Sequence, residues 1–317
     1  MTEGGAAFGL GEARPRGDVH RFSHEAMATV FEVHCVLEDV RYARQAADAA
    51  FALVDRLEQE LSRFVANSDV SRINSRASGG ATQVSPTTLE CLVIARHLYE
   101  VTHGAFDVSI GTGLDALDLD PETYTVHARR EGLRLDLGAI GKGYAVDRVA
   151  ELLGEWEVHN ALVHGGFSSV LALEAPPGQE GWPLSLSAPE DGRILARLEA
   201  RRLALGASGT RKGEHIRDPR TGRPAAGRAV WVSVRREPTT GGSPTAVADA
   251  LSTACMLLSE QEIKSLCRDG PGLEAWLLLE PAEGAATPAF LHLAGGRAEP
   301  GRKAVRRLSS RRPKNRE

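Results

Sequence analysis

The residue best placed for chemistry in this 317-residue chain is Lys142, which lies in a glycine-rich turn. Residues 133–147 read LRLDLGAIGKGYAVD, with alternating leucines before the turn and apolar residues at helical spacing after it. This pattern predicts a strand, a turn and a helix start. Amide groups at a helix start, together with the charge of Lys142, favour an anion such as a phosphate. The glycine spacing fits neither the dinucleotide fingerprint nor the Walker A motif, so a phosphate site and an ordinary strand-to-helix turn both stay open.

Asp249 and Thr253 form a second chemical pattern, four residues apart in a predicted helix. Residues with this spacing project from the same helix face. A carboxylate beside a hydroxyl offers hard oxygen ligands, which suit Mg²⁺ better than zinc. Such pairs also occur as surface residues or helix caps, so the pair alone does not decide whether a metal binds.

The elements that must position these residues are a mixture of helices and short strands. Apolar stripes predict helices at 41–64, 86–102 and 248–258, the second opened by Ser85 as cap and Pro86. Polar or turn-rich composition predicts loops at 67–80, 104–122 and 176–183. Strands are predicted at 31–37, 133–137, 161–163, 170–173, 194–198, 203–205, 230–234, 276–279 and 290–293. Because strands and helices do not alternate regularly, we expect an α+β fold with mixed, largely antiparallel sheets flanked by helices.

Composition sets limits on the class of protein. An apolar content of 42% in a chain of this length can bury one large core or two smaller ones. No window holds the roughly 20 apolar residues needed to cross a bilayer. Residues 301–317 carry eight Lys or Arg against one acid, a net +7, so the rest of the chain carries −11. The acidic body argues against nucleic-acid binding, and the basic end is predicted to be a solvated, disordered tail.

The four cysteines indicate a reducing compartment. Cys35, Cys91, Cys255 and Cys267 are scattered without CxxC spacing, and we expect them to be buried, reduced thiols. Residues 1–21 lack the apolar core of a secretory signal, and no cysteine follows one to take a lipid. A cytoplasmic location is the resulting expectation, unless the true start codon adds an export signal.

Six segments, taken together and in order, resemble the motifs of the ApbE family of FAD:protein FMN transferases over about residues 27–293. They are Met27-Ala28-Thr29, Leu61-Ser62-Arg63-Phe64, Gly104-Ala105-Phe106-Asp107, the run from Leu135 to Asp147, the loop from His215 to Gly222, and Ala248-Asp249-Ala250-Leu251-Ser252-Thr253-Ala254. The resemblance implies a flexible segment at 1–24, a flavin transferase domain at 25–296 and a basic tail at 297–317. The Gly165-Gly166 pair either permits close approach of the cofactor or belongs to a strand-end turn.

The activity that the resemblance implies is Mg²⁺-dependent transfer of FMN from FAD to a Thr or Ser hydroxyl of an acceptor protein, with release of AMP. Two alternatives stay open: a pyrophosphatase that hydrolyses FAD to FMN and AMP, and a non-catalytic FAD-binding protein. Neither the acceptor protein nor the oligomeric state follows from the sequence.

The resemblance also implies functional residues. The magnesium ligands would be Asp249, Thr253 and the backbone carbonyl of Ala139. The positions that hold FAD would be Met27, Phe64, Ala105, Phe106, Asp107, Asp136, Lys142 and His215. The catalytic residues would be His215, Asp249 and Lys142.

These residue types suit the implied roles. Mg²⁺ and Lys142 can neutralise the negative charge that grows on the leaving AMP. His215 can accept a proton near neutral pH and so activate the acceptor hydroxyl, or it is a loop imidazole held by backbone bonds. Asp218 either orients His215 or begins a turn. Phe64 and Phe106 either stack on a ring of FAD or pack in the core.

The chain departs from the family pattern at three places. Phe64 stands where the family usually has Tyr, so a hydroxyl contact to FAD is lost while stacking is kept. Phe167 follows the paired glycines where an acid or amide is usual. Ala207-Ser208-Gly209 replaces a common Thr-Ser-Gly. These changes leave the implied metal ligands intact and bear on FAD affinity and turnover.

Overall fold

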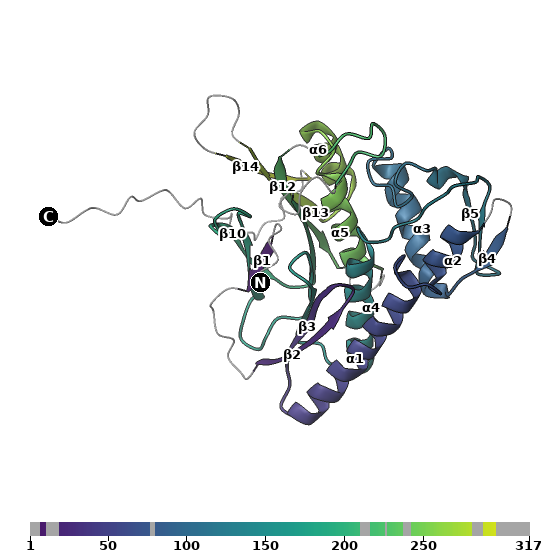
Figure 1. Cartoon of the computed structure of the whole chain (residues 1–317). Coiled ribbons are helices and arrows are strands. Elements are labelled where there is room, and N and C mark those ends of the chain that lie inside the picture. The colour runs from purple at the N-terminus through teal and green to yellow at the C-terminus, as the bar shows by residue number, and fades with distance from the viewer. Residues whose placement is uncertain are drawn as a thin grey trace.

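A large antiparallel sheet forms the centre of the computed structural model (Figure 1). The structure describes residues 7–10, 19–76, 80–209, 216–225, 227–236, 242–280 and 288–295. Within these ranges the sheet has eight strands in the order β14-β13-β12-β11-β8-β7-β3-β2, and every neighbouring pair is antiparallel. The strands are β2 (Val19–Ala26), β3 (Thr29–Val36), β7 (Ala161–Gly165), β8 (Ser169–Ala172), β11 (Leu203–Gly209), β12 (Arg228–Arg235), β13 (Leu273–Leu279) and β14 (Ala289–Ala294).

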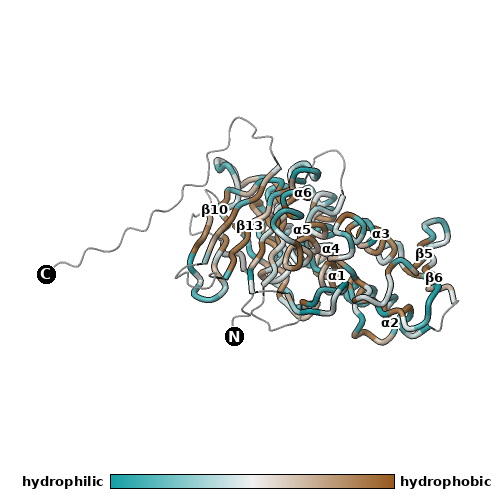
Figure 2. The backbone as a smooth tube through the Cα atoms, turned by 90° about the horizontal axis from the view of Figure 1, so that it is seen from above, coloured by the Kyte–Doolittle hydropathy of each residue, from teal (hydrophilic) through white to brown (hydrophobic). Residues whose placement is uncertain are grey.

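Helices cover one face of this sheet. α5 (Pro244–Ala254) packs on β11 and β12, α4 (Gly141–Glu155) packs on β7 and β8, and α1 (Val40–Leu61) packs on α4. The main apolar core lies between the sheet and these helices and includes Val146, Val230 and Val232. Figure 2 shows hydrophobic stretches around β13 and along α5, while α1 alternates between hydrophobic and hydrophilic residues.

A small sheet covers part of the opposite face. β1 (Ala7–Leu10), β9 (Trp182–Ser187) and β10 (Ile194–Ala200) pair in the order β1-β9-β10. A second core contains Trp231, Trp276 and Leu186, and Trp231 lies between Val230 and Val232 of the first core along β12. Where the small sheet covers it, the central sheet is therefore buried on both faces, and side chains along a strand alternate between the two cores.

A third group of elements lies at the far end of the helical layer in Figure 1. It contains α2 (Asp69–Ser75), α3 (Pro86–Val101) and a small sheet in the order β4-β6-β5. The strands of that sheet are β4 (Ala81–Gln83), β5 (Leu117–Asp120) and β6 (Thr125–Ala128). α6 (Glu260–Asp269) follows α5 and packs on β13 and β14.

The α+β expectation is confirmed, and most predicted elements are present. α3 begins as expected, because Ser85 Oγ accepts from Thr88 N at 3.1 Å and Pro86 occupies the first helical position. The helix predicted at 248–258 instead runs over Pro244–Ala254. α6 was not predicted, although Ser259 and Glu262 form a capping box at its start.

Four predictions of local structure were wrong or incomplete. The strand predicted at 133–137 is irregular, since the side-chain amide of Asn74 takes the backbone bonds of Leu135. The loop predicted at 67–80 contains α2, whose first turn is capped by Ser68. β5 lies in the loop predicted at 104–122, and β9 begins inside the break predicted at 176–183.

The two ends of the chain contain the expected boundaries of the flexible segment at 1–24 and of the basic tail at 297–317. β1 and residues 19–24 of β2 lie in the segment expected to be flexible, and β2 pairs with β3 from Val19 onward. The tail at 297–317 lies outside the described residues. The four cysteines are buried and unpaired, as expected. In the described ranges, no helix combines the length and apolar character that a bilayer span needs.

Candidate active site

The start of α4 meets the middle of α5 at very close range. Gly143 N donates to Asp249 Oδ2 at 3.1 Å. A Cβ added at Gly143 would lie 2.3 Å from the backbone oxygen of Thr245. The same holds on the other side of α5, where a Cβ at Gly206 of β11 would lie 2.1 Å from the oxygen of Ala248. Two glycines therefore let α5 lie between α4 and the sheet with its backbone in direct contact with both.

Asp249 is a buried carboxylate with a cationic partner. Its exposed fraction is 3%, and Lys142 Nζ lies 3.5 Å from Oδ2. Lys142 Nζ also donates to the carbonyl of Gly138 at 3.2 Å. Burial raises the pKa of Asp249, while Lys142, Gly143 N–H and the hydroxyl of Ser169 oppose the rise. A bound cation at this carboxylate would relieve the cost of burying its charge.

Thr253 lies one turn after Asp249 on the same helix face. Its hydroxyl is 3.5 Å from the backbone oxygen of Asp249 and 3.2 Å from Ser208 Oγ. Ser208 Oγ also lies 2.8 Å from Ser252 Oγ. Ser208, in the segment where the chain departs from the family pattern, thus links β11 to the predicted metal residues.

Ala139 lies in the turn that leads into α4. The residue that caps the helix is Ile140, so the carbonyl of Ala139 falls before the helical hydrogen-bond ladder. Lys142 bridges the neighbouring carbonyl of Gly138 to Asp249. The turn and the carboxylate therefore face the same small volume.

Asp147 fixes the start of α5. The helix has no side-chain cap of its own at Ser243, and Asp147 of α4 instead accepts from Thr245 N at 3.0 Å and Ala246 N at 2.8 Å. Burial raises the pKa of Asp147 to about 7, against the opposing effect of these hydrogen bonds. The sequence motif contains this carboxyl group without indicating its role, and the structure shows that it positions α5.

Asp136, Arg63 and Phe64 form a connected group beside the same turn. Asp136 Oδ1 accepts from Gly138 N at 2.9 Å, and Asp136 Oδ2 pairs with Arg63 Nε at 2.9 Å. The guanidinium carbon of Arg63 lies 4.4 Å from the centre of the Phe64 ring. Phe64 is 82% exposed, so its ring is not part of the core. An exposed aromatic ring backed by a guanidinium is a surface on which a flat ring can stack.

Ala105 and Phe106 are placed differently. Each is only 2% exposed, and both belong to the main core. The core interpretation therefore holds for the ring of Phe106, and contact with a ligand would have to involve the backbone. Asp107 folds its own loop, because its carboxylate accepts from Ser109 N and Gly111 N, each at 2.8 Å.

Met27 lies at the tip of the β2–β3 hairpin, where Met27 and Ala28 both have positive φ, at 50° and 55°. A hollow of about 430 Å³ beside this turn is lined by Met27, Thr29 and Glu58. The adjacent Gly166 has φ of 63°, and a Cβ there would lie 2.4 Å from Thr29 Oγ1. Packing against the hairpin accounts for this glycine, which supports the strand-end interpretation.

His215 lies outside the described residues, so its role stays a prediction. Asp218 forms a turn, since its carboxylate accepts from Arg220 N at 2.9 Å and its carbonyl accepts from Gly222 N at 2.7 Å. The hydrogen bonds that Asp218 makes are those expected from the turn interpretation.

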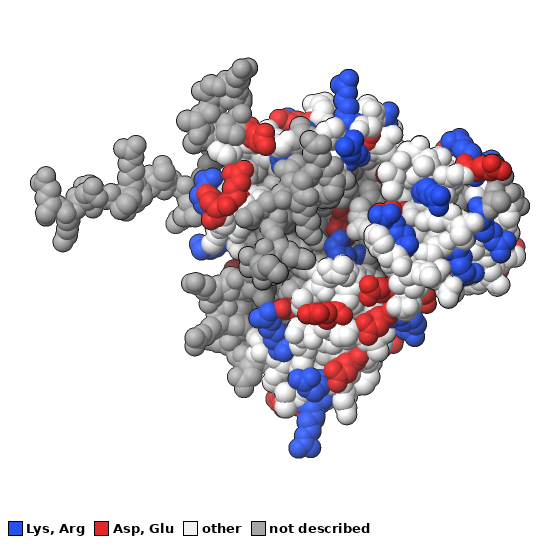
Figure 3. Space-filling view, in the orientation of Figure 1, with Lys and Arg blue, Asp and Glu red and all other residues white. Residues whose placement is uncertain are grey.

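The structure thus joins Asp249 to the turn before α4 through Lys142, and Asp136 binds the same turn at Gly138. Thr253 lies one turn after Asp249, and Ala139 follows Gly138 in the turn. In the space-filling view, a recess separates the part that carries α3 from the rest, and it contains both basic and acidic side chains (Figure 3). Sequence reasoning missed Ser169 and Ser208, whose partners lie far along the chain.

Comparison with known proteins gives a consistent result. The ApbE family model matches residues 27–125 and 112–277. Curated relatives named FAD:protein FMN transferase include one from Treponema pallidum, 27% identical with 77% of each chain covered. A second, from Vibrio cholerae, is 26% identical over 78% of this chain and 84% of its own.

Solved structures with the same fold include the flavin transferase ApbE from Vibrio cholerae, with a TM-score of 0.74, 21% identity, and coverage of 88% of this chain and 98% of that one. The ApbE protein from Thermotoga maritima also has a TM-score of 0.74, at 22% identity, covering 87% of this chain and 97% of its own. At these identities the likeness concerns the fold.

Proposed function

Since the chain belongs to the ApbE family, we propose that it transfers FMN from FAD to a protein. The observation that carries this proposal is the buried carboxylate of Asp249, which has Lys142 Nζ 3.5 Å from Oδ2 and lies one helical turn before Thr253. A cation-binding carboxylate beside a lysine suits the cleavage of a pyrophosphate better than it suits simple packing. The names of the curated relatives support the same activity.

The residues present fit a magnesium ion. Asp249 offers a buried carboxylate oxygen, Thr253 a hydroxyl one turn later, and Ala139 a carbonyl that precedes the helical ladder. All three are hard oxygen donors, and a site with so few protein ligands leaves positions for phosphate oxygens and water. When bound, Mg²⁺ would supply positive charge to the pyrophosphate of FAD.

Lys142 would act on the leaving group. Its ammonium already lies between the turn carbonyl and Asp249, and its side chain is 24% exposed. That position lets it donate to a phosphate oxygen without leaving the site. Its charge would stabilise AMP as the bond breaks.

The exposed ring of Phe64 would hold the flat part of FAD. Arg63 braces that ring and is itself held by Asp136, which caps the turn before α4. These contacts link the stacking surface to the turn that presents Lys142. Loss of the usual tyrosine hydroxyl leaves the stacking in place.

The transfer step would proceed at the phosphorus of the FMN half. The oxygen of an acceptor Thr or Ser attacks that phosphorus, the bond to the bridging oxygen breaks, and AMP leaves with the electron pair. The proton of the acceptor hydroxyl must pass to a base, and His215 is proposed for this role from its residue type and motif.

The test uses the full chain with FAD and Mg²⁺, with and without a flavin-acceptor domain. Fluorescent flavin bound covalently to the acceptor, with one AMP released for each flavin, is the expected result. An acceptor with its target hydroxyl removed serves as the control. AMP release without labelling would instead indicate a pyrophosphatase, and unchanged bound FAD would indicate a binding protein.

A further inference from the structure

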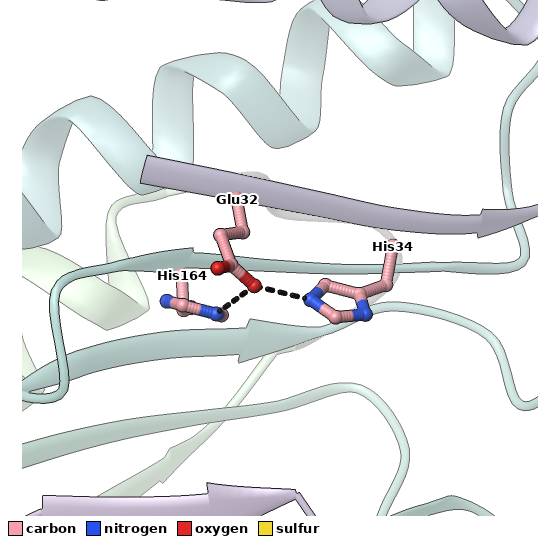
Figure 4. Close-up of side chains that lie close together, drawn as sticks. All are labelled: Glu32, His34 and His164. Atoms are coloured by element: carbon pink, nitrogen blue, oxygen red, sulfur yellow. Dashed lines mark hydrogen bonds and ion pairs between the residues drawn. The ribbon is translucent and has the colours of Figure 1, made fainter. Parts of the chain in front are cut away.

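Three potential metal ligands meet on the face of the sheet opposite α4 and α5. Glu32 and His34 lie on β3, and His164 lies directly opposite Glu32 on β7 (Figure 4). The alternate residues Phe31 and Val33 belong to the core on the helical side. The three side chains therefore point away from Asp249, and the sheet separates the two places.

The ligand atoms of the three residues converge. Glu32 Oε2 lies 2.8 Å from His34 Nε2 and 3.0 Å from His164 Nε2. One ligand atom from each residue can be chosen so that all lie within 4.8 Å of one another. The side chains are 8%, 7% and 12% exposed for Glu32, His34 and His164. Such spacing suits a shared ion after shifts of a few tenths of an ångström, since tetrahedral ligands about 2.0–2.1 Å from one metal lie about 3.3 Å from each other.

The hydrogen bond that His164 makes through Nδ1 shows which tautomer its neutral ring adopts. His164 Nδ1 lies 3.0 Å from the backbone oxygen of Gly166, and a carbonyl can only accept, so Nδ1 carries a hydrogen. In a neutral ring the lone pair is then on Nε2, which faces the carboxylate oxygen of Glu32. The contact therefore needs either a second proton on the ring or a bound cation that both atoms share. A histidine held by a backbone carbonyl through its other nitrogen is the usual arrangement in metal sites.

Arg21 of β2 orients the carboxylate. It pairs with Glu32 Oε1, which turns Oε2 toward both histidines. Outer contacts of this kind fix the direction of a metal ligand. The charge of Arg21 also balances part of the carboxylate charge, so a bound divalent ion would leave the site net positive and favour an additional anionic ligand.

We propose that Glu32, His34 and His164 form a second metal site, which takes Zn²⁺ or a similar borderline transition-metal ion. Two imidazoles and a carboxylate suit such ions, whereas Mg²⁺ prefers oxygen ligands. Three protein ligands leave a fourth position for water or an anion. The ring of Phe167, which is 52% exposed, lies 6.4 Å from that of His164 and marks the solvent side of the site.

The test is a titration of the metal-stripped full chain with Zn²⁺ in the presence of saturating Mg²⁺. We expect one tightly bound Zn²⁺ per chain, and with Co²⁺ as the probe we expect visible absorption bands from nitrogen and oxygen ligation. Zn²⁺ should also raise the thermal midpoint. His164→Gln and His34→Gln should each weaken Zn²⁺ binding by more than about 100-fold.

Two controls isolate the site. His24→Gln changes a histidine that lies 2.7 Å from a single carboxylate, Asp55, and should bind Zn²⁺ like the wild type. Asp249→Asn should also keep the tight Zn²⁺, because it alters only the flavin site. Circular dichroism reports whether each variant is folded, and FMN transfer with Mg²⁺ gives a second report for the three histidine variants only.

The proposal is overturned if the wild type takes up no Zn²⁺ beyond what excess Mg²⁺ displaces, whatever the variants do. It is also overturned if folded His164→Gln protein binds Zn²⁺ as the wild type does. Failure of FMN transfer in the wild type would contradict the proposed function and leave this site unaffected.

Discussion

Gly143 N of α4 donates to Asp249 Oδ2 of α5 at 3.1 Å, so one hydrogen bond joins the start of one helix to the proposed metal-binding carboxylate of the other. The contact exists because no side chain separates the two backbones. It places Asp249 beside Lys142, which is the next residue before Gly143 in the chain. The geometry of the proposed site therefore depends on how closely two helices approach.

Gly143→Ala tests that dependence. The added Cβ would lie 2.3 Å from the oxygen of Thr245, which is backbone and cannot turn aside, so α5 must shift. We expect Mg²⁺-dependent FMN transfer to fall at least tenfold, measured by labelling of an acceptor domain. Gly154→Ala is the matched control on α4, where nothing lies within 4 Å of the new Cβ. Equal rates in the two variants would contradict the role of the close contact.

Asp249→Asn tests the metal ligand with little change of shape. The amide oxygen can still accept from Gly143 N, while the negative charge that attracts a divalent ion is lost. We expect transfer to be abolished and Mg²⁺ binding, followed by calorimetry, to be lost. Burial raises the pKa of Asp249 in spite of Lys142, so its charged form is unfavourable in the folded state, and the free energy of unfolding should stay equal or rise in the variant. Wild-type turnover in this variant would remove the metal assignment.

Asp147→Asn tests the buried carboxyl that caps α5. In the wild type its pKa is raised to about 7, whereas in the unfolded chain it is about 4. Between these pH values the folded state holds a proton that the unfolded state has lost, so stability falls as pH rises. In the wild type this proton contributes a decrease in the free energy of unfolding of about 2 kcal/mol between pH 5 and 7.5. The variant should lack that decrease, as measured by urea unfolding at each pH.

The exposed carboxylate of Asp191 provides the control for that measurement. Asp191→Asn should follow the wild-type dependence of stability on pH, since its side chain is 59% exposed. An Asp147→Asn profile parallel to that of the wild type would show that this carboxyl does not hold its proton in the folded state.

Phe64→Ala tests the stacking surface. The side chain is 82% exposed, so its removal should change the free energy of unfolding by less than about 0.5 kcal/mol. Loss of a stacked ring should weaken FAD binding by about 1 kcal/mol, roughly fivefold, with KM rising more than kcat falls. Phe64→Tyr should bind FAD at least as tightly as the wild type. Unchanged FAD affinity in the alanine variant would remove Phe64 from the binding surface.

Local sequence signals predicted the elements whose causes are local. α3 was placed correctly because its cap, its first-turn proline and its apolar stripe lie within a few residues of one another. The segment 133–137 shows the opposite case. Its alternating leucines are buried as a strand's would be, but the side chain of Asn74, 61 residues away, takes the hydrogen bonds of Leu135 that a ladder would use.

The candidate site also combines a feature with a local cause and contacts between residues far apart in the sequence. The i, i+4 pair of Asp249 and Thr253 was visible in the sequence, because one helix sets its geometry. Ser208 was not assigned a role, since its contact with Thr253 depends on how β11 packs against α5. The meeting of His164 with Glu32 depends on strand register across 132 residues, which no local pattern specifies.

The close backbone contact between α5 and Gly206 of β11 has a wider consequence. Since a Cβ at Gly206 would lie 2.1 Å from the oxygen of Ala248, the main chain of β11 contacts the main chain of α5 at the residue next to Asp249, the proposed metal ligand. The height of the helix above the sheet is thus fixed by backbone atoms that every sequence shares. Side chains elsewhere in the core can therefore change without moving the carboxylate of Asp249, provided that Gly143 and Gly206 are retained. Relatives with different core residues can then keep α5, and with it the same carboxylate, at the same height above the sheet.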